Sequence, residues 1–270
     1  ADLEEIFDFQ FEERPGGVTV TARRKRHFLF DFGNYGSLRF EVRVPAETRL
    51  AVETSGGSVQ LSGTRRGGEL ETSGGSVRAG DVRGNLNIDT SGGSITVERL
   101  EGDLRAKTSG GSVRVSDVKG RVDVQTSGGN IEGDSLGGPV RARTSGGSVT
   151  LREIGADLNA NSSGGSIRIA DARGRVDAQT SGGSIEAELS AGNASGGTME
   201  TSGGGIRVGV DPSVDLEIDA SGGPVTLDLP MRVQGEVSRR HLRGVLGSGG
   251  AMLRLRASGG SCGGPSRSSP

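Results

Sequence analysis

The sequence predicts an all-β protein: a parallel β-helix, or β-solenoid, with eighteen-residue coils and a cap of antiparallel β-strands at its N-terminus. The main observation is a motif, T-S-G-G-S-V or a close variant, that recurs eight times at a constant interval of eighteen residues. Its copies begin at Thr54, Thr72, Thr90, Thr108, Thr126, Thr144, Ser162 and Thr180. Between the motifs, apolar and polar residues alternate as in strands with one buried face. The aromatic residues are confined to the first 40 positions, which separates an N-terminal segment from the repeats.

The composition excludes a thick globular core. Apolar residues make up 31% of the 270 residues and aromatic residues 3%, while 50 positions are Gly. Disorder is the rival explanation for such a composition, but a disordered segment does not need apolar residues in strict register. The net charge of −2 comes from 32 basic and 34 acidic residues that are mixed along the chain, so no nucleic-acid partner is expected.

Residues 1–50 are predicted to form the N-terminal cap. Apolar and polar residues alternate in three runs, at 7–11, 28–32 and 38–44. We expect antiparallel strands with an aromatic face that packs over the first coil, because an open solenoid end exposes unpaired backbone. The alternative is an exposed aromatic surface for a partner or a lipid.

A basic run separates the first two of these expected strands. It consists of Arg23, Arg24, Lys25 and Arg26. A solvated hairpin turn is its expected structure, and contact with an anionic surface is the alternative. These four residues are therefore the candidate interaction site of the sequence.

Residues 51–229 are predicted to form about ten coils of the solenoid. In the repeat 72–89, apolar residues alternate from Val77 and again from Leu86, and a Gly-containing turn separates the two runs. Each repeat is expected to contain two strands and two turns, with Val82 pointing inward, either at a corner or in a very short third strand. Stacking would place equivalent strands about 4.8 Å apart in parallel sheets, in a rod on the order of 50 Å long.

The first residue of each motif continues the inward alternation of the strand before it. The eight motif-initial residues are therefore expected to stack as a ladder of hydroxyl groups inside one corner. Outward charges are expected in columns of alternating sign: Glu69, Asn87, Arg105, Asp123, Arg141, Asn159 and Asp177 in one, and Arg114 beside Glu132, then Arg168, Glu186 and Arg207, in another. Because like charges opposed on adjacent strands are destabilising, this alternation supports the register. Glu71 beside Asp89 is an exception.

Residues 230–258 interrupt the repeat and are predicted to form a second cap and the last coil, where Leu253 and Leu255 return to the solenoid pattern. Residues 259–270 are predicted to be disordered, because Gly and Pro replace the strand that should follow Cys262. A single Cys excludes an intrachain disulfide and a cysteine-based metal site.

No motif predicts a catalytic, metal or cofactor site. The Gly-rich turns lack the Lys of a Walker motif and the strand-to-helix context of a nucleotide fingerprint. Calcium-binding β-rolls also have eighteen-residue coils, but Arg99 and Ser135 stand where other coils have Asp in the second turn. A polysaccharide-degrading β-helix would need paired carboxylates in a groove and aromatic platforms, and the repeats contain no aromatic residue. We therefore expect no enzymatic activity and no cofactor.

Two segments and the motif series between them resemble a bacterial β-strand-repeat family of unknown function, whose members are often labelled adhesins. The segments are V-R-V-P-A-E-T-R-L-A-V-E-T-S-G-G-S-V at 42–59 and G-S-G-G-A-M-L-R-L-R-A-S-G-G-S at 247–261. The likeness covers nearly the whole chain, which departs from the family where the last coil is cut short. It implies a right-handed parallel β-helix outside the cytoplasm (periplasmic, at the cell surface or secreted) without known enzymatic activity.

The sequence and the resemblance together favour a non-catalytic cell-envelope or extracellular β-solenoid. Its expected role is an adhesin-like interaction or spacer module, with a protein, a glycan or an anionic lipid of the envelope as partner. One alternative is a structural filament subunit that self-associates head to tail through the solenoid ends. Another is an envelope-stress or lipid-sensing module that recognises anionic lipid or peptide through Arg23–Arg26.

Overall fold

The computed structural model describes residues 7–14, 17–24, 39–223, 225–226, 232–233, 240–259 and 262–263. All secondary-structure elements within these ranges are β-strands, so the prediction of an all-β fold is confirmed. The chain divides into two compact units, residues 1–43 and 44–270.

The first unit contains one antiparallel strand pair, β1 (Phe7–Arg14) and β2 (Gly17–Arg24). β1 confirms the strand expected at 7–11, whereas β2 was not expected. Arg23 lies opposite Asp8 and Arg24 opposite Phe7 in this ladder, so the turn expected at these two arginines is wrong. The V-T-V-T alternation has high strand propensity and extends the ladder through them. Lys25, Arg26 and the strand expected at 28–32 lie outside the described residues.

Residues 39–45 are not a strand, in contrast to the expectation for 38–44. Alternation alone does not make a strand, because the backbone also needs a neighbouring strand to pair with, and within the described ranges this segment has none. Its apolar side chains are largely exposed, with Val42 at 64%. Phe40 still packs against Phe9 of β1 in an edge-on arrangement, with ring centroids 6.0 Å apart.

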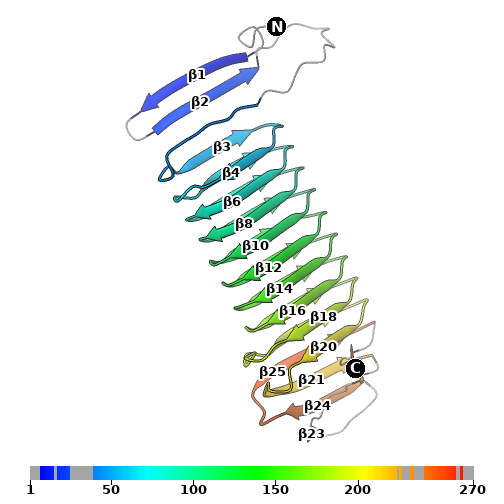
Figure 1. Cartoon of the computed structure of the whole chain (residues 1–270). Coiled ribbons are helices and arrows are strands. Elements are labelled where there is room, and N and C mark those ends of the chain that lie inside the picture. The colour runs from blue at the N-terminus through cyan, green and yellow to red at the C-terminus, as the bar shows by residue number, and fades with distance from the viewer. Residues whose placement is uncertain are drawn as a thin grey trace, which may run out of the picture. The chain divides into compact units, whose positions relative to one another are not determined.

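The second unit is a β-solenoid of two sheets, which Figure 1 shows as a staircase of stacked strands. In their spatial order, the strands of the thirteen-stranded sheet are β23 (Arg232–Val233), β24 (His241–Leu246), β21 (Leu216–Gly222), β25 (Ala251–Ala257), β19 (Gly197–Thr201), β17 (Val176–Thr180), β15 (Leu158–Ser162), β13 (Val140–Thr144), β11 (Val122–Gln125), β9 (Leu104–Thr108), β7 (Leu86–Thr90), β5 (Gly68–Thr72) and β3 (Leu50–Thr54). Those of the eleven-stranded sheet are β22 (Val225–Thr226), β26 (Cys262–Gly263), β20 (Ile206–Val210), β18 (Ile185–Leu189), β16 (Ile167–Ala172), β14 (Val149–Ile154), β12 (Ile131–Leu136), β10 (Val113–Val118), β8 (Ile95–Glu101), β6 (Val77–Arg83) and β4 (Val59–Ser62).

Nine successive coils, from β3–β4 to β19–β20, contribute one strand to each sheet, against about ten expected. From β3 to β18 the partners in the parallel ladders differ by eighteen residues, as for Val113 and Ile131, except at Ala172 and Leu189, where the register shifts by one. Alternate residues point between the two sheets, where Leu70, Ile88 and Ile95 are fully buried. The core is a single narrow layer of aliphatic side chains, which explains how the coils stack without aromatic residues.

The second strand of six coils, from β6 to β16, turns a corner that needs an unusual backbone conformation. Six non-Gly residues there adopt the left-handed region, with φ between 52° and 55°. They are Asp81, Arg99, Asp117, Ser135, Glu153 and Asp171. This turn of the backbone brings the next residue inward again, so Val82 is 1% exposed, which confirms the corner expected there.

At the other turn of the coil, within the T-S-G-G motif, successive coils approach so closely that only Gly fits at one position. A Cβ built on Gly111 would lie 2.0 Å from the carbonyl oxygen of Gly93 and 2.4 Å from its carbon. A Cβ on the neighbouring Gly110 would meet nothing closer than 3.5 Å, an ordinary contact. The second Gly of T-S-G-G is thus required by coil-to-coil contact and not by its own backbone angles.

The C-terminal repeat enters the solenoid out of sequence order. β25 inserts between β19 and β21 and pairs parallel with both, and β24 then pairs antiparallel with β21. This arrangement confirms that Leu253 and Leu255 rejoin the solenoid. The predicted disorder of 259–270 does not hold at Cys262–Gly263, which form β26 between β20 and β22, and residues 260–261 and 264–270 lie outside the described residues. Cys262 pairs with Ile206 in the parallel ladder, and this backbone pairing places it in a strand.

An expanded coil precedes β19, where the ladder partners Val176 and Gly197 differ by twenty-one residues instead of eighteen. Asn193 is fully buried in this turn. Its Nδ2 donates to the carbonyls of Ala172 and Gly174 at 3.2 and 2.7 Å, and its Oδ1 accepts from the N–H of Gly196 at 3.2 Å. The side chain therefore satisfies the backbone groups that the three extra residues displace from the regular ladder.

Replacing Gly111 by Ala should lower the free energy of unfolding by at least about 2 kcal/mol, because the added methyl group forces two backbones apart. The matched substitution Gly110→Ala should change it by less than about 0.5 kcal/mol. Urea unfolding followed by circular dichroism measures both. Equal effects of the two substitutions would contradict the steric explanation.

Candidate functional site

The ladder of hydroxyl side chains lies inside the corner where strands of the thirteen-stranded sheet end. Its members are Thr54, Thr72, Thr90, Thr108, Thr126, Thr144, Ser162 and Thr180, and all except the half-buried Thr54 are at most 6% exposed. Thr126 Oγ1 donates to the carbonyl of Gly111 in the preceding coil at 2.8 Å and accepts from the N–H of Gly129 in its own turn at 3.2 Å. Ser162 makes the same two bonds, at 2.9 and 3.0 Å. These hydroxyls are already engaged in holding coils together.

Side chains of the two turns link neighbouring coils as well. The last Ser of the motif accepts from the next coil, as when Ser94 Oγ accepts from the N–H of Ser112 at 3.2 Å. At the other turn, Asp103 Oδ1 accepts from the N–H of Arg121 at 2.8 Å. The equivalent position in the next coil is Pro139, which has no N–H to donate. The side chain before it in this column, that of Arg121, has no acceptor to offer, so no hydrogen bond is lost. Since the turns direct N–H groups at neighbouring coils, they do not form the open N–H cradle of a phosphate site.

The left-handed corner residues form an outward column of charges. Arg99 donates two hydrogen bonds to Asp81, at 2.7 and 2.9 Å, and this contact lowers the pKa of Asp81 below its ordinary value of 3.8. Beside this column, the ammonium group of Lys119 donates to Glu101 at 2.6 Å and lowers the pKa of that carboxyl below 4.5. Asp81 and Glu101 are thus each paired with a cation, while Glu153 and Asp171 accept from the hydroxyls of Ser135 and Ser190, unlike the several convergent oxygens of a calcium site.

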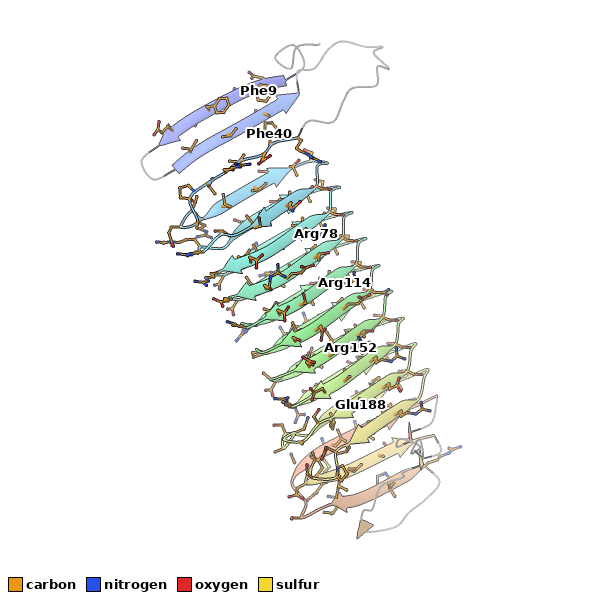
Figure 2. All side chains as sticks on the ribbon, in the orientation of Figure 1. Phe9, Phe40, Arg78, Arg114, Arg152 and Glu188 are labelled. Atoms are coloured by element: carbon orange, nitrogen blue, oxygen red, sulfur yellow. The ribbon has the colours of Figure 1, made fainter. Side chains whose placement is uncertain are left out.

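The outward face of the eleven-stranded sheet also pairs many of its charges. Arg114 bonds Glu132 at 2.5 Å, and Glu186 lies 3.1 Å from Arg168 and 3.9 Å from Arg207. The ladder registers confirm this predicted column. Figure 2 shows Arg78, Arg114, Arg152 and Glu188 along this face. Exposed pairs of this kind contribute little individually to stability, on the order of 0–1 kcal/mol each.

The outward face of the thirteen-stranded sheet has a different charge pattern. Its ladder registers confirm the predicted column of alternating charges and the opposed pair Glu71 and Asp89. Strands β9, β11 and β13 present four cations and one carboxylate on this face, namely Arg105, Lys107, Asp123, Arg141 and Arg143. Within the described ranges, none of the four cationic side chains has a hydrogen bond or an ion pair. The sequence showed this column but not that its cations are unpaired.

Two shallow open grooves lie on this same face. The first has a volume of about 370 Å³ and is lined by Gln125, Thr126, Arg143, Thr144, Ser145, Asn161, Ser162, Ser163, Gln179 and Ser181. The second has a volume of about 270 Å³ and is lined by Arg121, Val122, Asp123, Pro139, Val140, Arg141, Asp157, Leu158, Asn159, Arg175 and Asp177. The lining of the first groove is mostly polar and that of the second is mixed, and neither groove encloses its contents.

The described part of the chain offers no arrangement for catalysis by a metal. No three His, Cys, Asp or Glu side chains within it converge as ligands, and each of its buried side-chain nitrogen and oxygen atoms has a hydrogen-bond partner. None of the described segments is a helix of the length and hydropathy needed to cross a membrane. The chemistry that the faces present is non-covalent contact through charges, amides and hydroxyls.

Comparison with known proteins gives one family match. The family model described as Toastrack DUF4097 matches residues 6–163, more than half of the chain, from the first unit into the coil of β15. No curated protein and no solved structure matches the chain.

Substitution of Thr126 by Val should lower the free energy of unfolding by about 1–3 kcal/mol, because it leaves the Gly111 carbonyl and the Gly129 N–H without their partner. Thr126→Ser keeps the hydroxyl, as the natural Ser162 does, and should cost about 1 kcal/mol for the lost methyl group. Chemical denaturation of the two variants provides the comparison. A larger loss for Ser than for Val would show that packing, and not hydrogen bonding, holds the ladder.

Acidification should weaken the corner column. Since the folded pKa values of Asp81 and Glu101 lie below their ordinary values, their contribution to stability is present above those values and is lost as the pH falls through the folded ones. The urea midpoint of the native chain should therefore fall below about pH 4 more steeply than that of an Asp81→Asn, Glu101→Gln variant. Identical slopes would contradict this assignment.

Proposed function

The chain belongs to the Toastrack DUF4097 family, whose function is not established, and we propose that it is a non-catalytic, adhesin-like interaction module. It works outside the cytoplasm and presents the lateral faces of its solenoid to a partner in the cell envelope. The localisation and the class of partner rest on the resemblance of the motif series to envelope proteins.

The observation that carries this proposal is the constant register of the coils from β3 to β17, which extends to β18 as far as Ile169. Eighteen-residue coils leave no room for long inserted loops, so the outward side chains of both sheets lie on flat, continuous faces. Enzyme sites usually need a concave pocket that excludes water, whereas flat faces with exposed charged and amide groups suit reversible binding. The two shallow grooves on the thirteen-stranded sheet fit the same role.

A spacer role uses the same solenoid in another way. A spacer depends on the length and stiffness of the stacked coils and not on the chemistry of a face. The unpaired cations and the first, mostly polar groove favour interaction, because a spacer has no use for their concentration on one sheet.

The other two roles have weaker support. Head-to-tail assembly would continue the parallel ladder at the sheet ends, but the last strands of the thirteen-stranded sheet, β24 and β23, are antiparallel. Lipid sensing through the basic run would use Arg23 and Arg24 from a strand and not from a protruding turn.

A binding assay on isolated cell envelopes tests the proposal. The labelled chain should bind saturably and be displaced by excess unlabelled chain. Attachment of polyethylene glycol at Gln125→Cys on the thirteen-stranded face should block binding, and attachment at Thr150→Cys on the eleven-stranded face should not, both in a Cys262→Ser background. Folded chain without saturable binding would contradict the interaction role and leave the spacer.

A further inference from the structure

We propose that the outward face of the thirteen-stranded sheet, from β9 to β17, binds a linear carboxylated glycan laid along the solenoid axis. This inference rests on the proposed interaction role and names the partner and the surface. Two sets of side chains carry it. The basic rows are Arg105 and Lys107 on β9 and Arg141 and Arg143 on β13, and the amide row is Gln125, Asn161 and Gln179.

The basic rows have charge to offer a ligand. Strands β9, β11 and β13 together present four cations against Asp123, and these cations have no ion-pair partner in the described part of the chain. Arg105, Arg141 and Arg143 are exposed and Lys107 is half-buried. Guanidinium groups bind carboxylates through two parallel hydrogen bonds. Elsewhere on the solenoid, arginines such as Arg99, Arg114 and Arg168 already bind carboxylates of adjacent coils.

The spacing of the rows suits a linear polymer. β11 lies between β9 and β13, so equivalent cations stand about 10 Å apart along the axis, which is two strand spacings. A chain with carboxylates at regular intervals can therefore contact both rows at once. Multiple weak contacts of this kind add up because the second forms at high effective concentration.

The amide row supplies contacts to sugar hydroxyls. The amides share one column along the axis with a basic residue, in the order Gln125, Arg143, Asn161 and Gln179. The larger groove runs along this column. An amide both donates and accepts hydrogen bonds, as a hydroxyl does. The exposed Ser145, which also lines the groove, adds a further hydroxyl at its edge.

The acidic end of the face decides among anionic partners. Glu53, Glu71 and Asp89 precede Lys107 in the same column and oppose one another on β3, β5 and β7. Asp89, Glu71 and Glu53 lie one, two and three strand spacings from Lys107, about 5, 10 and 14 Å, close enough to repel a broad anionic surface such as a membrane. A narrow glycan chain can lie over the basic and amide rows alone. A second copy of this chain, with its acidic end on the basic rows, is the competing partner that the experiment must separate.

Fluorescence anisotropy with labelled oligogalacturonate and a neutral maltooligosaccharide of equal length tests the proposal. The native chain should bind the carboxylated probe, more weakly as salt rises, and should not bind the neutral one. Arg141→Gln, Arg143→Gln should weaken binding at least about tenfold through loss of charge-assisted bonds. Gln125→Ala, Gln179→Ala should weaken it about threefold without changing the salt dependence, because only neutral hydrogen bonds are lost.

The matched control removes the same charge from the other sheet. Arg78 and Arg152 are exposed, have no ion pair within the described ranges and lie on the eleven-stranded face (Figure 2). Arg78→Gln, Arg152→Gln should change affinity less than about twofold, as surface charges distant from a contact do. An equal loss for both double variants would overturn the assignment to this face.

Other results would also overturn the proposal. Binding to phosphatidylglycerol vesicles but not to oligogalacturonate would assign the face to lipid. No glycan binding, together with a dimer at low salt that Arg141→Gln, Arg143→Gln dissociates, would assign it to a second copy. If envelope binding persists without oligogalacturonate binding, only this inference fails; if saturable envelope binding is absent as well, the proposed function fails with it.

Discussion

The structure depends on one constraint, the close backbone approach between coils at the T-S-G-G turn. There the second Gly of one coil lies against the carbonyl of the Gly eighteen residues earlier, as Gly111 does against Gly93. The carbonyl oxygen of Gly93 also accepts the hydrogen bond that the buried hydroxyl of Thr108 donates. One contact thus fixes the distance between coils, the residue type at the turn and the corner hydroxyl. A change in coil length must then be compensated locally, as Asn193 does in the expanded turn.

This constraint also limits where function can reside. The interior is filled by aliphatic side chains, and the corner hydroxyls and turn N–H groups bind adjacent coils. Only the outward positions of the strands vary in chemistry without disturbing the stack. On the eleven-stranded face many of these positions form ion pairs along the axis, whereas β9 to β13 on the other face leave cations unpaired. The difference between the faces is therefore a property of side-chain choice on an otherwise uniform scaffold.

The C-terminal end follows a different rule from the rest of the solenoid. Successive coils add in chain order through β19–β20, but β25 and β26 then enter between earlier and later strands. Such an insertion needs the slot between β19 and β21, so its contacts join segments that are distant in sequence. β24 ends the parallel order by pairing antiparallel with β21. The chain thus closes this sheet with its own strands, and Cys262 takes an ordinary strand position.

The sequence by itself determined the parts of this protein that repeat. The eighteen-residue interval, the alternation of apolar residues and the turn glycines specify two strands per coil, the charge columns and the corner at Val82, because each copy meets the same neighbour. Tertiary structure decided what does not repeat. The pairing of Arg23 and Arg24 in β2, the absence of a strand at 39–45 and the insertion of β25 each depend on which backbone lies alongside, and alternation within one segment cannot specify that partner. The unpaired state of Arg141 and Arg143 was decided in the same way, since it depends on side-chain geometry between coils and not on their order in the chain.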